Sequence, residues 1–270
     1  MVIPIHDRNP VRRVPVVTYA LIAINFAVFI IGPVSGLTTR YGSGPRLACA
    51  QNTYFMEYGA IPKELLSNHQ LPPERIGVQQ GGQTFICPVE RYHKAPIFSA
   101  FTAMFVHGGW LHLLGNMLFL YVFGNNVEDQ LGRLRYLLFY LGCGLIATYA
   151  FAAFTGPGST QPLVGASGAI AGVLGAYLWL FPRAKVTSLV PFLLFLPFRL
   201  PAWLVLGGWF VLQWAYAQGA GMSGDAGVAY FAHIAGFLAG LLYAIIFVRR
   251  PRWPPVSGYP SGQPPGYYGR

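Results

Sequence analysis

The sequence predicts a polytopic membrane protein of the all-α class, a bundle of six transmembrane helices with one long external loop. Three observations support this fold class. Hydrophobic residues make up 54% of the chain and charged residues only 10%, whereas about a quarter of a soluble domain is charged. Apolar stretches of roughly 20 residues, the length that crosses a bilayer as a helix, recur along the chain. Basic residues gather in alternate connecting segments.

The apolar stretches define six predicted spans. They are residues 14–32, 108–124, 135–154, 166–182, 201–217 and 227–248. Lys and Arg occur before the first span, between the second and third, between the fourth and fifth, and after the sixth, but not in the short connections 155–165 and 218–226. Because short cytoplasmic loops are enriched in Lys and Arg, we expect both termini in the cytoplasm, at a prokaryotic plasma membrane.

This layout divides the chain into three parts. A cytoplasmic segment (1–13) precedes a membrane domain (14–248), and a tail (249–270) rich in Pro, Gly and Tyr is expected to be disordered. The membrane domain includes a long external segment, residues 33–95, which we call the first loop. It contains Cys49 and Cys87, and the sequence leaves open whether they form a disulfide. The net charge of +10 is explained by the cytoplasmic span ends beside lipid head groups, so no nucleic-acid partner is expected.

The polar residues inside the spans narrow the possible chemistry. All eight acidic residues lie outside them, which excludes paired intramembrane aspartates and the H-E-x-x-H motif of a membrane zinc protease. No metal or cofactor is therefore expected. Polar side chains in a bilayer are costly and point to function. Those that remain in the spans are Asn25, His112, Asn116, Ser167, Gln213 and His233.

Three of these polar residues come from different spans at a similar depth. His112, Ser167 and His233 each lie within the first two turns of a span that runs inward from the outer face. Small residues flank two of them. On the fourth span Gly168 and Gly172 are four residues apart, and on the sixth Ala232, Gly236 and Gly240 repeat at the same interval. This spacing lets helix backbones approach closely, so we expect Ser167 and His233 to meet.

A serine that meets a histidine suggests nucleophilic catalysis. The hydroxyl is a poor nucleophile until a base removes its proton, and the candidate bases in the spans are His112 and His233. Acyl transfer also requires donors for the developing oxyanion. His112 and Asn116 share one helix face at i and i+4 and could both donate. Ser167 begins a helix, where free backbone N–H groups favour negative charge.

Three motifs, in this order, carry a resemblance to a known family. They are HGGWLHLLGNMLFLYVFGNNVEDQLG at 107–132, GASG at 165–168 and AHIAGFLAG at 232–240. They resemble the second-helix H-x4-H-x3-N, the G-x-S-G and the sixth-helix A-H-x2-G motifs of the rhomboid family of intramembrane serine proteases. The similarity covers about residues 95–248. It implies a six-helix protein that cleaves transmembrane protein substrates within the lipid bilayer.

The resemblance also implies a role for each motif residue. Ser167 is implied as the nucleophile and His233 as the general base and later acid. The Ser167 backbone N–H, His112 and Asn116 are implied as the oxyanion site. His107, at the family's outer histidine position, is expected to play a supporting part. The same is expected of the motif glycines Gly165, Gly168, Gly236 and Gly240, while Glu128 and Gly132 are expected to be architectural.

Two positions depart from the family pattern. The Trp-Arg pair that many members carry before the second helix is Phe98-Ser99 here, which leaves the anchoring of the first loop unexplained. Some members place a tyrosine four residues after the serine, where it stacks on the catalytic histidine, but this chain has Ala171. Tyr230 is one candidate to hold His233 instead.

Two other functions stay open at this point. A catalytically inactive relative of rhomboid fold could bind membrane clients as a chaperone or adaptor. A proton-coupled transporter could use His112 and His233 as a relay, although transport sites usually lie near the midplane of proteins with internal repeats. The sequence does not predict the oligomeric state or the natural substrate.

Overall fold

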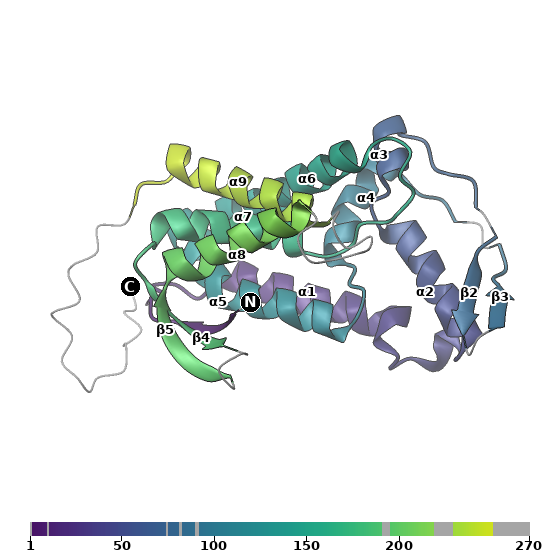
Figure 1. The fold of residues 1–270 in the computed structure, drawn as a ribbon, viewed down its shortest axis with the longest axis horizontal. Helices are drawn as coiled ribbons and strands as arrows, with labels where there is room; N and C mark the ends of the chain where they lie inside the picture. Colours follow the sequence, from purple (N-terminus) through teal and green to yellow (C-terminus); the bar gives the residue numbers. More distant parts are fainter. Residues whose placement is uncertain are drawn as a thin grey trace.

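A helix lies at each of the six predicted span positions (Figure 1). The computed structural model describes residues 2–9, 11–73, 75–80, 83–89, 92–190, 195–218 and 229–250. The six helices are α1 (Val16–Ile31), α5 (Trp110–Leu131), α6 (Arg133–Thr155), α7 (Ser167–Leu180), α8 (Ala202–Ala217) and α9 (Ala229–Phe247). The predicted disorder of the tail falls almost entirely on residues outside the described ranges.

These helices differ in whether they are long enough to cross a membrane. By length and composition alone, α6 and α9 are the two described helices that could each cross a membrane. Helix α5 adds a third if it is joined to the segment Pro96–Phe105, which meets it at 82°. Helices α1, α7 and α8 are apolar but only 16, 14 and 16 residues long. The count of six spans therefore stays a prediction.

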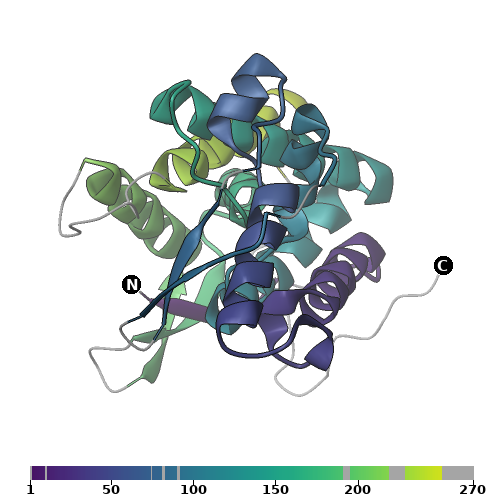
Figure 2. The ribbon, with the colours of Figure 1, turned by 90° about the vertical axis from the view of Figure 1, so that its right-hand side faces the viewer.

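Helix α7 forms the centre of the bundle. Its residues 169–177 are all buried, as expected for a helix that is apolar on every side. Helix α8 is the opposite case, since only four of its residues are buried. Figure 2 shows α8, in green, at the edge of the bundle. The structure thus places Ser167, the first residue of α7, at one end of the central helix.

The structure differs from an all-α fold by five short strands outside the bundle in the described part of the chain. Strands β1 (Ile3–Asp7), β4 (Lys185–Val190) and β5 (Leu196–Pro201) form an antiparallel sheet in the order β1-β4-β5. In the sequence KVTSLV of β4, every second residue is buried, the period of a half-buried strand. This sheet lies at the far end of the bundle from the hairpin of β2 (Gly77–Gln80) and β3 (Gln83–Ile86), as Figure 1 shows.

The first loop is folded rather than open. It contains 3-10 turns at Pro33–Ser35 and Thr39–Tyr41, helices α2 (Pro45–Tyr58) and α3 (Pro62–Ser67), and the β2–β3 hairpin; α4 (Pro96–Thr102) and a 3-10 turn at Ala103–Phe105 lead from it to α5. Helices α2, α3 and α4 each begin with a proline. Proline suits this position because the N–H of the first helical residue has no partner within the helix and proline has no N–H. Cys49 and Cys87 form a disulfide that joins α2 to the residue after β3.

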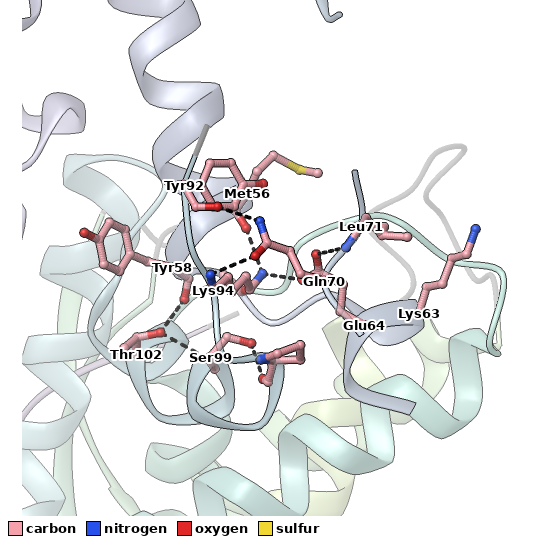
Figure 3. Close-up of polar contacts among 12 residues, drawn as sticks. Met56, Tyr58, Lys63, Glu64, Gln70, Leu71, Tyr92, Lys94, Ser99 and Thr102 are labelled. Atoms are coloured by element: carbon pink, nitrogen blue, oxygen red, sulfur yellow. Dashed lines mark hydrogen bonds and ion pairs between the residues drawn. The ribbon is translucent and has the colours of Figure 1, made fainter. Parts of the chain in front are cut away.

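A buried ion pair anchors the first loop (Figure 3). The Nζ atom of Lys94 lies 2.6 Å from Glu64 Oε2 and donates hydrogen bonds to the carbonyls of Met56 and Gly59, both at 2.7 Å. The other carboxylate oxygen of Glu64 accepts a bond from the Leu71 N–H at 2.9 Å. Burial lowers the pKa of Lys94, although the Glu64 carboxylate opposes this effect. Lys94 and Glu64 therefore join α2, α3 and the approach to α4.

Residues at the opposite end of α5 fix the start of α1. The carboxylate of Glu128 is 3% exposed and accepts bonds from the backbone N–H groups of Val17 and Thr18, at 3.0 and 2.8 Å, and from the Thr18 hydroxyl at 2.8 Å. These N–H groups have no partner within a helix, and the helix dipole favours a negative charge beside them. Gly132 ends α5 with a φ of 78°. Both residues act in the architecture, as expected.

Candidate active site

The loop that leads to Ser167 requires glycine at position 165. Gly165 has a φ of +123°, and its N–H donates to the Ala103 carbonyl at 2.8 Å. A Cβ atom at Gly165 would lie 2.7 Å from His112 Nε2 and 3.7 Å from Asn116 Nδ2. Both the backbone conformation and the lack of space therefore require glycine here. The close approach also brings the α5 residues His112 and Asn116 against the loop that carries Ser167.

The backbones of α7 and α9 are in direct contact along the two predicted glycine stripes. A Cβ atom at Gly236 would collide with the carbonyl oxygen of Gly168, and one at Gly240 would collide with that of Gly172. On its other side, Gly168 faces α6, where a Cβ would lie 2.6 Å from that of Ala147. These glycines let α9 approach closely enough for His233 to reach α7.

The side chains of Ser167 and His233 are hydrogen-bonded. His233 Nε2 lies 2.8 Å from Ser167 Oγ, and His233 Nδ1 lies 2.8 Å from Oε1 of Gln213 on α8. The amide oxygen of Gln213 can only accept, so the Nδ1–H donates to it, and the neutral Nε2 then accepts the Ser167 hydroxyl proton. This tautomer is assigned from the hydrogen-bond network. It is the one in which imidazole can act as a base toward the serine.

Two aromatic rings lie beside the imidazole of His233. The ring of Trp209 lies 5.9 Å from that of His233 between centroids, with 38° between the planes. Tyr230, the candidate from the sequence, lies edge-on at 6.4 Å. Ala171 is completely buried within the bundle. Trp209 and Tyr230 thus contact His233, but its polar partner is Gln213, which the sequence marked only as a polar group in a span.

The α5 face presents two donors toward the same loop. His112 Nδ1 accepts a hydrogen bond from the Gly108 N–H at 3.3 Å, so its proton is on Nε2, the atom that lies nearest to Gly165. The Asn116 side chain is 8% exposed, and its Nδ2 has no hydrogen-bond partner in the described part of the chain. A buried amide without a partner costs free energy unless a ligand uses it. Both groups are free to donate to a developing negative charge.

His107 occupies a different position from these donors. It is 1% exposed, and its ring lies edge-on to His112, with centroids 5.1 Å apart. The structure therefore places His107 inside the protein, packed against the ring of His112. Its packing can restrict the ring of His112, and the supporting part of His107 stays a prediction.

The first loop holds the connection that precedes Ser167. Ala60 and Leu163 exchange two backbone hydrogen bonds, both 2.9 Å long, and the Lys63 N–H donates to the Ser159 carbonyl at 3.0 Å. A Cβ atom at Gly59 would lie 2.9 Å from that of Pro162. The folded first loop therefore supports residues 159–164, immediately before the GASG sequence.

Comparison with known proteins gives the class of this fold and site. The family model described as the Rhomboid domain matches residues 94–250. The chain therefore belongs to the rhomboid family, whose members are generally serine proteases.

Several curated relatives are similar to the chain over part of their length. RHOMBOID-like protein 6 of Arabidopsis thaliana, described as mitochondrial, is 31% identical over 174 residues, 62% of this chain and 48% of its own. RHOMBOID-like protein 2 of the same plant is 27% identical over 240 residues, 87% and 67% of the two chains. YdcA of Bacillus subtilis, provisionally named a rhomboid protease, is 40% identical over 83 residues, which make up 29% of this chain and 39% of YdcA. The chain spans about half the length of the first relative.

Proposed function

We propose that this protein is an intramembrane serine endopeptidase that hydrolyses peptide bonds of transmembrane protein substrates. The observation that supports this best is the 2.8 Å hydrogen bond between Ser167 Oγ and His233 Nε2. It joins a hydroxyl and an imidazole from α7 and α9, which are 66 residues apart in the sequence. A nucleophile within 2.6–3.2 Å of its base, with a third group that orients the base, is the arrangement expected for nucleophilic catalysis.

In the acylation step, Ser167 Oγ attacks the carbonyl carbon of the scissile bond while its proton passes to His233 Nε2. The carbonyl oxygen becomes an oxyanion, for which the Ser167 backbone N–H, His112 Nε2–H and Asn116 Nδ2 are the proposed donors. When the tetrahedral intermediate collapses, the C–N bond breaks and His233 gives its proton to the leaving amine. The product is an acyl ester on Ser167 and a free amino terminus.

The deacylation step uses the same groups with water as the nucleophile. His233 Nε2 accepts a proton from the water, whose oxygen attacks the ester carbonyl. The second tetrahedral intermediate expels Ser167 Oγ, which recovers its proton from His233. Hydrolysis thus consumes one water and restores the enzyme, and no metal or cofactor enters either step.

The proposed location of cleavage follows from where the site lies in the bundle. Helices α5, α7 and α9 begin at the end of the bundle that carries the site, and α8 ends there. With six spans and both termini in the cytoplasm, this end faces the outer side of a plasma membrane. We therefore expect cleavage near the outer end of a substrate helix. Helix-destabilising residues in the substrate should help by exposing the scissile backbone.

A cleavage assay tests this function. Purified protein in detergent or liposomes is mixed with a fluorescent transmembrane substrate, and the cleavage rates of the wild type, Ser167→Ala and His233→Ala are compared. We expect both variants to bind the substrate but not to cleave it. Equal cleavage by the wild type and Ser167→Ala would refute the proposal. Binding without cleavage by the wild type would instead favour the inactive chaperone or adaptor.

A further inference from the structure

The buried residues of helix α8 fall in two separate parts of its length. All sixteen of its residues are described, and only four of them are buried. Three are apolar and lie within the first five residues of the helix, and the fourth is a glutamine two turns further on. In order, they are Ala202, Val205, Leu206 and Gln213. The second half of α8 thus directs one buried side chain toward the bundle, and that side chain is polar.

The amide oxygen of the buried Gln213 makes a hydrogen bond to the candidate catalytic histidine. Its side chain is 5% exposed, and a buried amide is costly unless it is hydrogen-bonded. Its Oε1 accepts the bond from His233 Nδ1 at 2.8 Å. An apolar residue at this position would avoid the cost of burial and could fill the same space, so the amide points to a requirement at His233 rather than to packing.

The contact has a direct consequence for the chemistry of the imidazole. A neutral imidazole carries its proton on either nitrogen, and only the Nδ1–H form leaves Nε2 free to accept a proton from Ser167. An acceptor at Nδ1 selects that form, fixes the rotation of the ring and stabilises the imidazolium formed during attack. All eight acidic residues of the sequence lie outside the predicted spans. The amide oxygen supplies the acceptor without the cost of a buried charge.

We propose that Gln213 is the positioning residue that holds His233 in its reactive tautomer, and that the dyad is therefore competent only while the second half of α8 packs against α9. The inference rests on the proposed function, because it assigns Gln213 a part in the same reaction. It also gives α8 a role in controlling catalysis, since moving its second half away removes the acceptor from His233.

Two substitutions separate positioning from packing. Gln213→Met keeps the size of the side chain and removes the acceptor, and Gln213→Glu keeps an acceptor oxygen. If Gln213 positions His233, Gln213→Met lowers kcat about 10–100-fold with KM nearly unchanged, by analogy with the loss on removing a group that orients a metal-binding histidine. Gln213→Glu then stays within about tenfold of the wild type. If Gln213 only packs, the order reverses, because a buried carboxylate is costly and methionine is not.

The matched control is Gln218→Met, which changes the same residue type at an exposed position just beyond the end of α8. Activity is measured in two ways: kcat and KM with the transmembrane substrate, and the rate at which a small fluorophosphonate labels Ser167. Because the reagent is small, its reaction does not depend on a helix movement that would admit a long substrate. Labelling of Gln213→Met at the wild-type rate would overturn the inference and leave the proposed function intact. Equal labelling of the wild type and Ser167→Ala would instead overturn the proposed function.

A double-mutant cycle tests the dependence on α8. Phe210 of α8 packs on Phe237 of α9, with ring centroids 4.7 Å apart, so Phe210→Ala loosens α8 without removing a group that contacts His233. We expect Phe210→Ala to slow fluorophosphonate labelling several-fold in the wild type and to have no further effect in Gln213→Met. Equal effects in both backgrounds would mean that α8 and the dyad are not coupled through Gln213.

Discussion

Lys94 and Glu64 form an ion pair that is almost completely shielded from solvent, with side chains 2% and 0% exposed. Lys94 also satisfies two backbone carbonyls, and Glu64 one backbone N–H. Removing one partner leaves an uncompensated buried charge, which typically costs 3–5 kcal/mol, whereas replacing both with apolar residues is far less harmful. The pair therefore stabilises a specific arrangement of the first loop rather than adding a large net free energy.

We predict that Lys94→Met lowers the thermal unfolding temperature and exposes the first loop to proteases, and that Lys94→Met with Glu64→Leu recovers much of the loss. The measurement is thermal unfolding in detergent together with limited proteolysis. Lys63→Met is the matched control, because Lys63 lies in the same loop with an exposed side chain. If the double variant is as unstable as the single one, the uncompensated charge is not the cause.

The disulfide between Cys49 and Cys87 gives a second prediction. It closes a loop of 38 residues, a length for which a disulfide typically contributes about 2–4 kcal/mol. Alkylation of the denatured, unreduced protein should modify one of its three cysteines, Cys143, and reduction should expose all three. Mass spectrometry counts the modified thiols. Three reactive thiols before reduction would show that the bond does not form.

The buried carboxyl group of Asp7, at the end of β1, leads us to predict that the stability of the protein depends on pH. Its Oδ2 accepts bonds from the Tyr177 hydroxyl at 2.7 Å and the Asn126 amide at 2.8 Å. Burial raises the pKa of Asp7 from 3.8 to about 6, although the hydrogen bond from Tyr177 opposes the rise. The folded state then keeps a proton that the unfolded state has lost, so stability falls as pH rises from about 4 through about 6.

The substitution Asp7→Asn should remove this dependence and raise stability above pH 6 by up to roughly 3 kcal/mol. Unfolding temperatures measured from about pH 4.5 to about pH 8 test it. The control is Asp129→Asn. Asp129 lies near the end of α5, as does Asn126, the α5 residue that contacts Asp7. This variant should keep the pH dependence of the wild type. A steeper fall in stability with rising pH in Asp7→Asn would contradict the account.

The sequence was informative where one local pattern determines a structure. Apolar runs predicted a helix at each of six positions, and the glycine stripes beside Ser167 and His233 predicted the contact between α7 and α9. These signals work because a helix and its small-residue face are encoded over consecutive turns.

Other features depend on partners that are distant in the chain. Asp7 meets Tyr177 across 170 positions, and Gln213 meets His233 from another helix. No local pattern specifies such pairs, although a lone glutamine in an apolar helix was a signal that a partner exists. The burial alternates along Lys185–Val190, but the sequence does not, because its apolar residues are Val186, Leu189 and Val190 and the buried residue between them, Ser188, is polar.

The proposed oxyanion donors give a prediction about rate rather than stability. Asn116→Ala removes one donor and should lower kcat about 10²–10³-fold while the fold persists. Gly165→Ala should be at least as damaging, because its φ of +123° and the contact with His112 leave no space for a methyl group. Gly142→Ala is the control, since a Cβ there meets nothing within 4 Å. An Asn116→Ala variant as fast as the wild type would exclude this side chain from the oxyanion site.

The most direct test of the central claim is the covalent modification of Ser167. The wild type is treated with a fluorophosphonate, and the modified residue is located by intact mass and peptide mapping. The account predicts a single adduct on Ser167, absent in Ser167→Ala and formed far more slowly in His233→Ala, because His233 must take up the hydroxyl proton. An adduct at any other residue, or equal modification of the wild type and His233→Ala, would contradict it.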